Sequence, residues 1–325
     1  MNPARAAGIY SKRYHDTKAD KEEEMYVITG ATGHTGNEVA EKLLAKGEQV
    51  RVVGRSAKRL EPLVKKGAEV FVADITDTAA LTKAFSGAKG VYAMIPPDVS
   101  APDVLAHYQR VGDALAAAIE KSGVKYAVVL SSLGADKPDK TGPVVGLHNL
   151  EKKLGAIPGL NALYLRPGSF MENLLSQVGV IKAFGTMAGP EKGDLPIPMI
   201  ATRDIGDAAA DALLQLDFQG KSTRELQGSR DVTNTEAAKI IGAAIGKPDL
   251  TYKQMPAAQL KPAFVQMGMS SNMADLLLEM EDALNSGYMR TIEPRSPRNT
   301  TPTTLETFAA EVFAPAYRGQ KAARA

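Results

Sequence analysis

From Met25 onward, short apolar runs alternate with amphipathic stretches that are long enough to form helices. This alternation is typical of βαβ units, in which each crossover helix returns the chain to a neighbouring parallel strand. The apolar runs are rich in Val and Ile, as expected for strands that are buried on both faces. The pattern therefore predicts a doubly wound α/β fold, in which a ligand binds beyond the carboxyl ends of the parallel strands.

The predicted elements follow the apolar runs and the stripes between them. We expect strands at residues 25–29, 49–53, 69–72, 91–95, 126–130 and 163–165. The helices predicted between them are residues 36–46, 102–122 and 147–154. Crossovers of this length join parallel neighbours, so all of these strands should run in the same direction.

After Arg166 the alternation of apolar runs and amphipathic stretches becomes less regular. Gly and Pro residues, which favour turns, are frequent between residues 189 and 198. We expect a smaller, mostly helical cap here, facing a substrate. Thr233 with Glu236 and Thr303 with Glu306 have capping-box spacing, so helices should begin near each pair, and residues 272–284 are a further helical candidate. The predicted domains are a flexible tail at 1–24, a first domain at 25–167 and the cap region at 168–325. Within the cap region, residues 201–230 are expected to pack back on the first domain.

Composition excludes several classes of function. The 325 residues carry 39 Lys and Arg against 37 Asp and Glu, and a net charge of +2 offers no field for a polyanion. Cysteine is absent, which removes disulfides and thiolate chemistry and fits a reducing cytoplasm. His15 and His107 lack partners at ligand spacing and are predicted to lie in the tail and on a helix surface. Charged residues interrupt every apolar run before the roughly 20 residues of a membrane span. We expect no metal, nucleic acid or membrane partner.

The first 24 residues have no apolar h-region and end in the acidic run 22–24, so we predict a tail and not a secretory signal. An organelle transit peptide is the alternative, because no acidic residue precedes Asp16.

A glycine-rich loop lies between the first predicted strand and the first predicted helix. It reads Gly-Ala-Thr-Gly-His-Thr-Gly, and GxxGxxG in this position is typical of the Rossmann dinucleotide site. The first glycine can take the tight turn, the second lets the backbone approach a pyrophosphate, and the third lets the helix pack closely on the strand. The helix amides would hold the phosphate charge. The residues predicted to contact a nucleotide are Gly30, Thr32, Gly33, His34, Thr35 and Gly36. The alternative is a glycine turn without a ligand.

The end of the second predicted strand favours NADP(H) over NAD(H). A site for NAD usually places Asp or Glu here to bind the ribose 2′-hydroxyl, but this chain has Arg55. Arg55 offers a planar cationic fork to a 2′-phosphate, and Lys58 adds charge nearby. After the third strand, Asp74 is placed to accept from the adenine amino group while Ile75 packs on the ring. The alternatives are a solvated basic turn and an exposed turn acid.

Several motifs together resemble those of the NmrA-like branch of the atypical short-chain dehydrogenase/reductases. This branch includes quinone-reductase-like and redox-sensor-like proteins, and the resemblance covers nearly all of the chain after Met25. The motifs are GATGHTG at 30–36, VVGR ending at Arg55, VADITD containing Asp74, LSSLGA at 130–135, LRPGSFMENLL at 165–175 and RDIGDAA from Arg203. The resemblance implies that residues 25–167 form an NAD(P)-binding Rossmann domain.

The resemblance also implies where catalysis would take place. Ordinary members of the wider superfamily have a serine after the fifth strand and a YxxxK helix whose tyrosine exchanges a proton. Here Ser131 and Ser132 stand at the place of the serine, and Ser131 is expected to contact the cofactor. The helix has no tyrosine but carries His148 and Lys152, which are four residues apart and share one face. We predict that they form the catalytic pair, with His148 as proton donor or neutral hydrogen-bond partner. A solvated helix face is the alternative for Lys152.

The cofactor's reactive end is expected at the carboxyl edge of the sheet. The resemblance implies that Phe170, Glu172 and Asn173 line it, with Ile95 and Pro96 shaping the ribose site. Packing against the cap is the alternative for Phe170.

Two functions fit these features. The first is an NADPH-dependent oxidoreductase that passes hydride to a small quinone-like or carbonyl acceptor. The second is a non-catalytic redox sensor that binds NADP(H) and acts through a protein partner. A nucleotide-sugar epimerase or dehydratase is disfavoured, because it ordinarily requires the missing tyrosine. A homodimer is compatible with either function.

Overall fold

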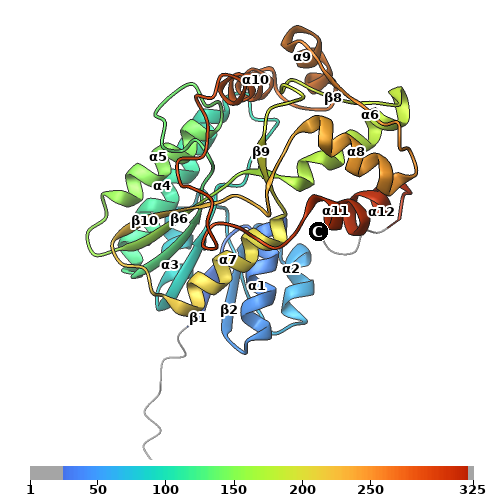
Figure 1. Cartoon of the computed structure of the whole chain (residues 1–325). Coiled ribbons are helices and arrows are strands. Elements are labelled where there is room, and N and C mark those ends of the chain that lie inside the picture. Colours follow the sequence, from blue (N-terminus) through green and yellow to red (C-terminus); the bar gives the residue numbers. More distant parts are fainter. Residues whose placement is uncertain (1–24, 321–325) are drawn as a thin grey trace, which may run out of the picture.

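A computed structural model of the chain describes residues 25–320. Its centre is a seven-stranded parallel sheet with the strand order β10-β6-β5-β4-β1-β2-β3, which confirms the predicted doubly wound fold (Figure 1). The strands of this sheet are β1 (Met25–Ile28), β2 (Gln49–Gly54), β3 (Glu69–Val72), β4 (Ala88–Ala93), β5 (Tyr126–Leu130), β6 (Asn161–Pro167) and β10 (Lys221–Leu226).

Helices cover both faces of the sheet, and each face has its own apolar core (Figure 1). One face is covered by α3 (Thr78–Phe85), α4 (Val104–Ser122) and α5 (Val144–Gly155). The other is covered by α1 (His34–Ala45), α2 (Ala57–Val64) and α7 (Thr202–Gln215). The strands between these two cores are therefore shielded from water on both sides, as their Val-rich sequences predict.

Several boundaries differ from the sequence-based expectations for local reasons. Strand β4 begins at Ala88, because Ala88 and Gly90 already pair with β1, with a shift of register at Lys89 between them. Helix α4 begins after Pro102, where the Asp103 carboxylate accepts a hydrogen bond from the Ala106 amide. The sequence analysis did not predict α2 and α3, although Ser56 and Asp77 cap their first turns in the same way.

The chain returns from the cap to the sheet through α7 and β10. Helix α7 packs against α1, and β10 then joins the sheet parallel to β6. The close approach of α7 to α1 depends on Gly206, where an added Cβ would lie 2.4 Å from the Cβ of Glu38. The motif that begins at Arg203 therefore contributes to the helix packing beneath the glycine loop.

Most of the remaining elements surround a third apolar core and form the cap, whereas α10 (Ser271–Asn285) packs through Met273 and Leu276 on the α3–α4–α5 core. Two small sheets, β11-β9-β7 and β12-β8, lie among the helices of the cap. The cap strands are β7 (Ser169–Phe170), β8 (Met187–Gly189), β9 (Ile197–Ile200), β11 (Asp231–Val232) and β12 (Tyr252–Gln254). The helices are a 3₁₀ helix η1 (Met171–Ser176), α6 (Gln177–Phe184), α8 (Asn234–Ile245), α9 (Ala257–Gln266), α10 (Ser271–Asn285), α11 (Leu305–Phe308), a π-helical turn η2 (Ala309–Phe313) and α12 (Ala314–Tyr317). In residues 25–320, no helix has the length and apolar character that a membrane crossing requires.

Helices begin near both predicted capping boxes, as expected, but only the first of the two threonines is itself the cap. Thr233 caps α8 by accepting from the Glu236 amide. At the other site, Thr304 and not Thr303 is the cap of α11. Thr303 is instead held by Asp204, whose carboxylate accepts from the amide and the hydroxyl of Thr303. The contact with Asp204 on α7 therefore uses the Thr303 hydroxyl, which the local spacing predicted to cap α11.

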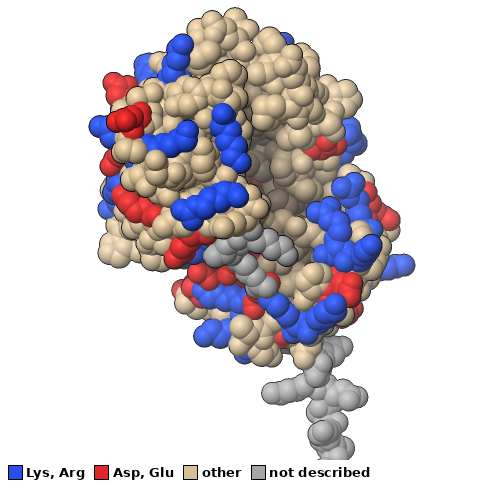
Figure 2. All heavy atoms as spheres, turned by 90° about the vertical axis from the view of Figure 1, so that its right-hand side faces the viewer, with Lys and Arg blue, Asp and Glu red and all other residues tan. Residues whose placement is uncertain are grey.

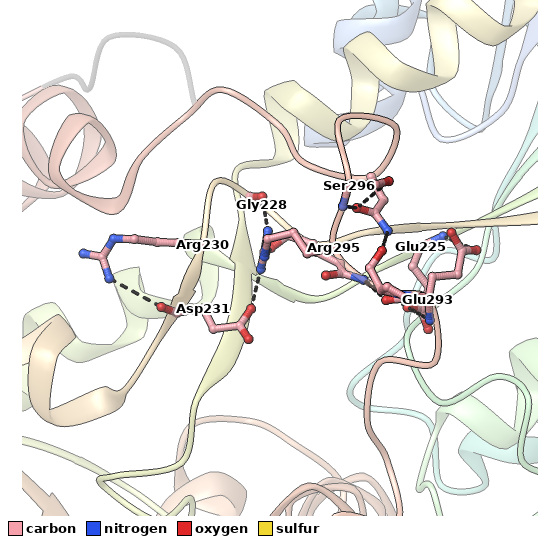
Figure 3. Close-up of polar contacts among 10 residues, drawn as sticks. Glu225, Gly228, Arg230, Asp231, Glu293, Arg295 and Ser296 are labelled. Atoms are coloured by element: carbon pink, nitrogen blue, oxygen red, sulfur yellow. Dashed lines mark hydrogen bonds and ion pairs between the residues drawn. The ribbon is translucent and has the colours of Figure 1, made fainter.

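A polar cluster holds the segment before α11 against the outer edge of β10 (Figure 3). The buried carboxylate of Glu225 accepts from the amides of Ile292 and Glu293. Arg295 donates to the carbonyl of Gly228 and pairs with Asp231. Because β10 is an edge strand of the large sheet, this segment satisfies polar groups there and blocks pairing with another chain.

The packing of α7 on α1 gives a direct test. We expect Gly206→Ala to lower the free energy of unfolding by about 1–3 kcal/mol, because the added methyl group overlaps Glu38. The control is Gly179→Ala on α6, where an added Cβ meets no atom within 4 Å among the described residues. Urea denaturation of both variants measures the difference. Equal stability of the two variants would contradict this account of the packing.

Candidate functional site

The loop after β1 is held in one conformation by the neighbouring strand β4. The hydroxyl of Thr29 donates to the carbonyl of Tyr92 and accepts from the amide of Met94. Gly30 has φ of +66°, a left-handed conformation that glycine adopts without strain. An added Cβ at Gly36 would lie 2.5 Å from the Gly30 carbonyl oxygen, so only glycine lets α1 start this close to the strand.

The N-terminus of α1 faces the loop without a side-chain cap. Its N-cap residue is Gly33 in an extended conformation, no side chain of the described residues caps it, and the first turn contains no acidic residue. The first amides of a helix lack intrahelical partners and carry partial positive charge, so this end of α1 is suited to an anion. Thr32, Gly33 and His34 are exposed there.

Thr35 differs from the other predicted loop contacts, because its side chain is buried. Its hydroxyl accepts a hydrogen bond of 3.0 Å from the phenol of Tyr92. Burial raises the pKa of Tyr92, so the phenol keeps its proton and donates it to Thr35. The Thr35 hydroxyl therefore ties α1 to β4, and its amide is the group that faces the loop's anion site.

The ends of β2 and β3 present the residues predicted to select the nucleotide. Arg55 and Lys58 are exposed directly after β2, and Asp74 is exposed after β3. Hydrogen bonds from Thr76 to one carboxylate oxygen of Asp74 lower the pKa of Asp74, and the charge of Arg55 lowers it further. Asp74 is thus an anionic acceptor near Arg55, and Ile75 packs half-buried at the edge of the α3–α4 core.

His107 belongs to this edge, and its predicted place on the helix surface is wrong. It is half-buried on α4, and its Nε2 donates to the carbonyl of Pro96 over 3.2 Å. Its charge contributes to the lowered pKa of both Asp74 and Asp98. Ile95 is buried beside Pro96, in the core. The sequence could have indicated this position, because α4 begins shortly after β4 ends. Its first turns therefore lie near the carboxyl edge of the sheet, where a ligand is expected.

Ser131 is buried and bonded to a residue that the sequence analysis did not select. Its hydroxyl donates to Glu151 on α5 over 2.5 Å. The same carboxylate accepts two hydrogen bonds from the guanidinium of Arg166 on β6, of 3.0 and 2.6 Å. Both charged groups are buried, so each depends on the other for its partner. Glu151 therefore positions α5 on the sheet. The sequence feature that could have indicated this role is Arg166 in the LRPG motif, a charged residue at the end of a buried strand that needs an acidic partner.

His148 and Lys152 do share a helix face, as predicted. They line one hollow of about 450 Å³ between α5 and β10, which we call the flank hollow; its lining residues are Ala135, Asp136, His148, Glu151, Lys152, Gly155, Tyr164, Arg166, Lys221, Ser222 and Thr223. The Nδ1 of His148 donates to the carbonyl of Ala135 over 2.9 Å, and Lys152 is exposed.

The flank hollow lies on the opposite side of α5 from α4. Gly146 contacts Tyr108 on α4, and Lys153 pairs with Asp113 on α4. Residues two apart on a helix are separated by about 200°, so His148 lies opposite Gly146. At about 4.8 Å per strand, β1 with its glycine loop is roughly 19 Å from β10. The hollow therefore opens on the side of α5 that faces away from the glycine loop.

The stretch from Phe170 to Asn173 runs from β7 into η1. Phe170 is half-buried against the α1–α7 core. Both carboxylate oxygens of Glu172 accept from the Thr202 amide, and one also accepts from its hydroxyl, so Glu172 stabilises the N-terminus of α7. Asn173 is exposed. Of the polar side chains predicted here, the one that faces solvent is Asn173.

Comparison with known proteins decides the family. The model of the NmrA-like family matches residues 22–309, which is most of the chain. The chain belongs to the NmrA-like family. This confirms the resemblance seen in the sequence motifs.

Two relatives of this NmrA-like protein are named as a quinone oxidoreductase and a reductase. Quinone oxidoreductase 2 of Escherichia coli is 30% identical over 270 residues, 81% of this chain and 89% of the relative. A (4-alkanoyl-5-oxo-2,5-dihydrofuran-3-yl)methyl phosphate reductase of Streptomyces griseus is 29% identical over 224 residues, 69% of this chain and 75% of the relative.

Solved structures agree with the fold. The Escherichia coli NADPH-dependent quinone oxidoreductase in complex with NADPH has a TM-score of 0.74 and 26% identity, and covers 89% of this chain and 100% of its own. NmrA, a negative transcriptional regulator in complex with NADP, has a TM-score of 0.60 and 16% identity, covering 91% of this chain and 98% of its own. At that identity NmrA shows the fold alone.

The cap of this NmrA-like protein contains a second group of ionisable side chains. The phenol of Tyr252 donates to the carbonyl of Glu191 over 2.9 Å and to its carboxylate over 3.2 Å. Glu281 on α10 faces the same carboxylate, and its Oε2 is buried without a hydrogen-bond partner in the described part of the chain. Burial first, and then the charge of Glu191, raise the pKa of Glu281 well above its ordinary value.

This raised pKa predicts a stability that falls as pH rises. Above about pH 4.5 the unfolded chain loses the Glu281 proton first, while the folded protein keeps it until pH passes its raised pKa. We therefore expect Glu281→Gln to be more stable than the native chain at pH 8, with the gain shrinking toward pH 5. Thermal denaturation at both pH values measures this. The control is Glu120→Gln at an exposed position of α4; a pH-independent difference at Glu281 would contradict the assignment.

Proposed function

We propose that this protein is an NADPH-dependent reductase of a small quinone-like or carbonyl acceptor. The observation that carries the proposal is the uncapped N-terminus of α1 set against the glycine turn, with Arg55 exposed at the end of the adjacent strand. The relationship to a quinone oxidoreductase at 30% identity supports the reaction class.

The residues present fit the two anionic parts of NADPH. A pyrophosphate would lie on the first amides of α1, where Thr32, Gly33 and His34 are exposed. The 2′-phosphate would lie on Arg55, whose guanidinium can donate two parallel hydrogen bonds. Asp74 has a carboxylate oxygen beyond the one that Thr76 holds, and this oxygen can accept from an adenine amino group.

The bound nicotinamide would supply a hydride at the carboxyl edge of the sheet. Phe170 and Asn173 stand where the chain leaves that edge for the cap, and we propose that they contact the acceptor or the nicotinamide. Figure 2 shows a hollow whose walls are mostly uncharged residues, with Lys and Arg along its rim, and we propose that this hollow takes the acceptor. Uncharged walls suit a neutral, flat acceptor.

Proton supply limits the choice of acceptor. The helix α5 carries no tyrosine at the family's acid position, and His148 and Lys152 line the flank hollow on the far side of α5 from α4. We therefore leave both out of the proposed hydride-transfer site. Hydride addition to a quinone gives a stabilised oxyanion that takes its proton from water, so this acceptor class needs no acid from α5. The sensor alternative is not proposed, because the relatives of highest similarity described above are reductases.

The choice of nucleotide can be tested at Arg55. We expect Arg55→Ala to weaken NADPH binding by about tenfold or more and NADH binding far less, because only NADPH carries the 2′-phosphate. Calorimetric titration of both nucleotides measures the effect. Lys46→Ala, at the opposite end of α1, removes the same charge and should leave both affinities unchanged. Equal losses for NADPH and NADH at Arg55 would contradict the assignment.

The reaction itself is tested by turnover. Purified protein is mixed with NADPH and a panel of small quinones and aldehydes, and the absorbance of reduced nicotinamide is followed. We expect quinones to be reduced faster than aldehydes, because their reduced form needs less help from an acid. Tight NADPH binding without turnover of any acceptor would overturn the reductase and favour a sensor.

A further inference from the structure

The flank hollow is a candidate binding site that the proposed reductase chemistry does not use. Its volume of about 450 Å³ lies within the range of roughly 300–1,000 Å³ typical of small-molecule sites. Helix α5 forms one wall and the first residues of β10 form the other. The question is therefore which ligand these walls would hold.

The charges that line the hollow leave a positive balance. The guanidinium of Arg166 is paired with Glu151, and Asp136 is paired with Lys137. Two ammonium groups are left. That of Lys221 donates to the carbonyls of Ile157 and Leu160, which do not neutralise it, and Lys152 has no hydrogen-bond or ion-pair partner within the described residues. An anion would therefore be attracted by two lysines.

Hydrogen-bonding groups add to this attraction. Thr223 lies in register with Tyr164 on the face of β10 that is turned to α5, so its hydroxyl can meet a ligand oxygen in the hollow. Since the Nδ1 of His148 is bonded to Ala135, its Nε2 is left to accept from a ligand hydroxyl or, when protonated, to donate to an anion.

We propose that the flank hollow binds a small phosphate monoester with a hydroxylated carbon skeleton. Two lysines, the hydroxyl of Thr223 and the ring of His148 present more hydrogen-bonding groups than the two oxygens of a single carboxylate can use, whereas a phosphoryl group offers three acceptor oxygens. Lysine suits a phosphate as a mobile point charge. The β10 wall of the hollow lies four strands from β1, and the hollow opens on the side of α5 turned away from α4, so the phosphate monoester binds separately from the dinucleotide.

The experiment uses the ring proton signals of the histidines, of which the chain has four. The His148→Gln variant identifies the His148 signal by its loss. The probe is glycerol 3-phosphate, added with and without saturating NADP⁺, and glycerol is the uncharged control. We expect glycerol 3-phosphate, and not glycerol, to shift the His148 signal saturably under both conditions. Because the titration without NADP⁺ does not need the dinucleotide site, its result is independent of the proposed reductase function.

Variants then test the residues. The double variant Lys152→Ala with Thr223→Val should weaken glycerol 3-phosphate binding by about tenfold or more. The control is Lys121→Ala, an exposed lysine near the end of α4. A His148 signal that does not move, or equal affinity of the double variant and the control, would overturn the site. A His148 signal that moves with NADPH alone would also overturn it, because the hollow would then belong to the dinucleotide site.

Discussion

The close contact between the glycine turn and the first turn of α1 is the constraint on which the candidate site depends. A side chain at Gly36 would overlap the carbonyl of Gly30, so the helix begins where it does only because both positions are glycine. The contact leaves the first amides of α1 without a side-chain cap, facing the carboxyl edge of the sheet. Tyr92 on β4 holds this arrangement, because its carbonyl accepts from Thr29 and its phenol donates to Thr35. Helix α7 supports α1 from the other side through Gly206.

Helix α5 separates two environments. On its inner side, Glu151 is buried against Arg166 and Ser131, which fixes the helix on β5 and β6. On the side turned from α4, His148 and Lys152 line the flank hollow with β10. Removing one partner of the buried pair would leave an unpaired charge, which is far more costly than loss of an exposed lysine. The same helix thus has a fixed face that supports the fold and an open face that is free to meet a ligand.

Much of the fold was predictable because its signals are local. Apolar runs identified all six strands predicted up to Leu165, and glycine spacing located the turn before α1. The misses have physical causes. Strand β4 starts at Ala88 and Gly90, which pair with β1 although they do not belong to an apolar run. Thr303 donates to Asp204 on α7 and does not cap its own helix. Glu151 and His107 were not selected, because their partners Arg166 and Pro96 are brought near only by folding.

The sequence by itself determined the alternation of strands and helices, the glycine turn and the presence of Arg55 where an acidic residue would otherwise bind a ribose. These features depend on residues that are close together in the sequence, and the periods of strand and helix make such patterns visible there. Only the tertiary structure decided which side of α5 faces which neighbour, since the direction of a helix face depends on what packs against it. The spacing of His148 and Lys152 predicts that they lie on one face of α5. The packing of α4 and β10 on either side of α5 decided which way that face points.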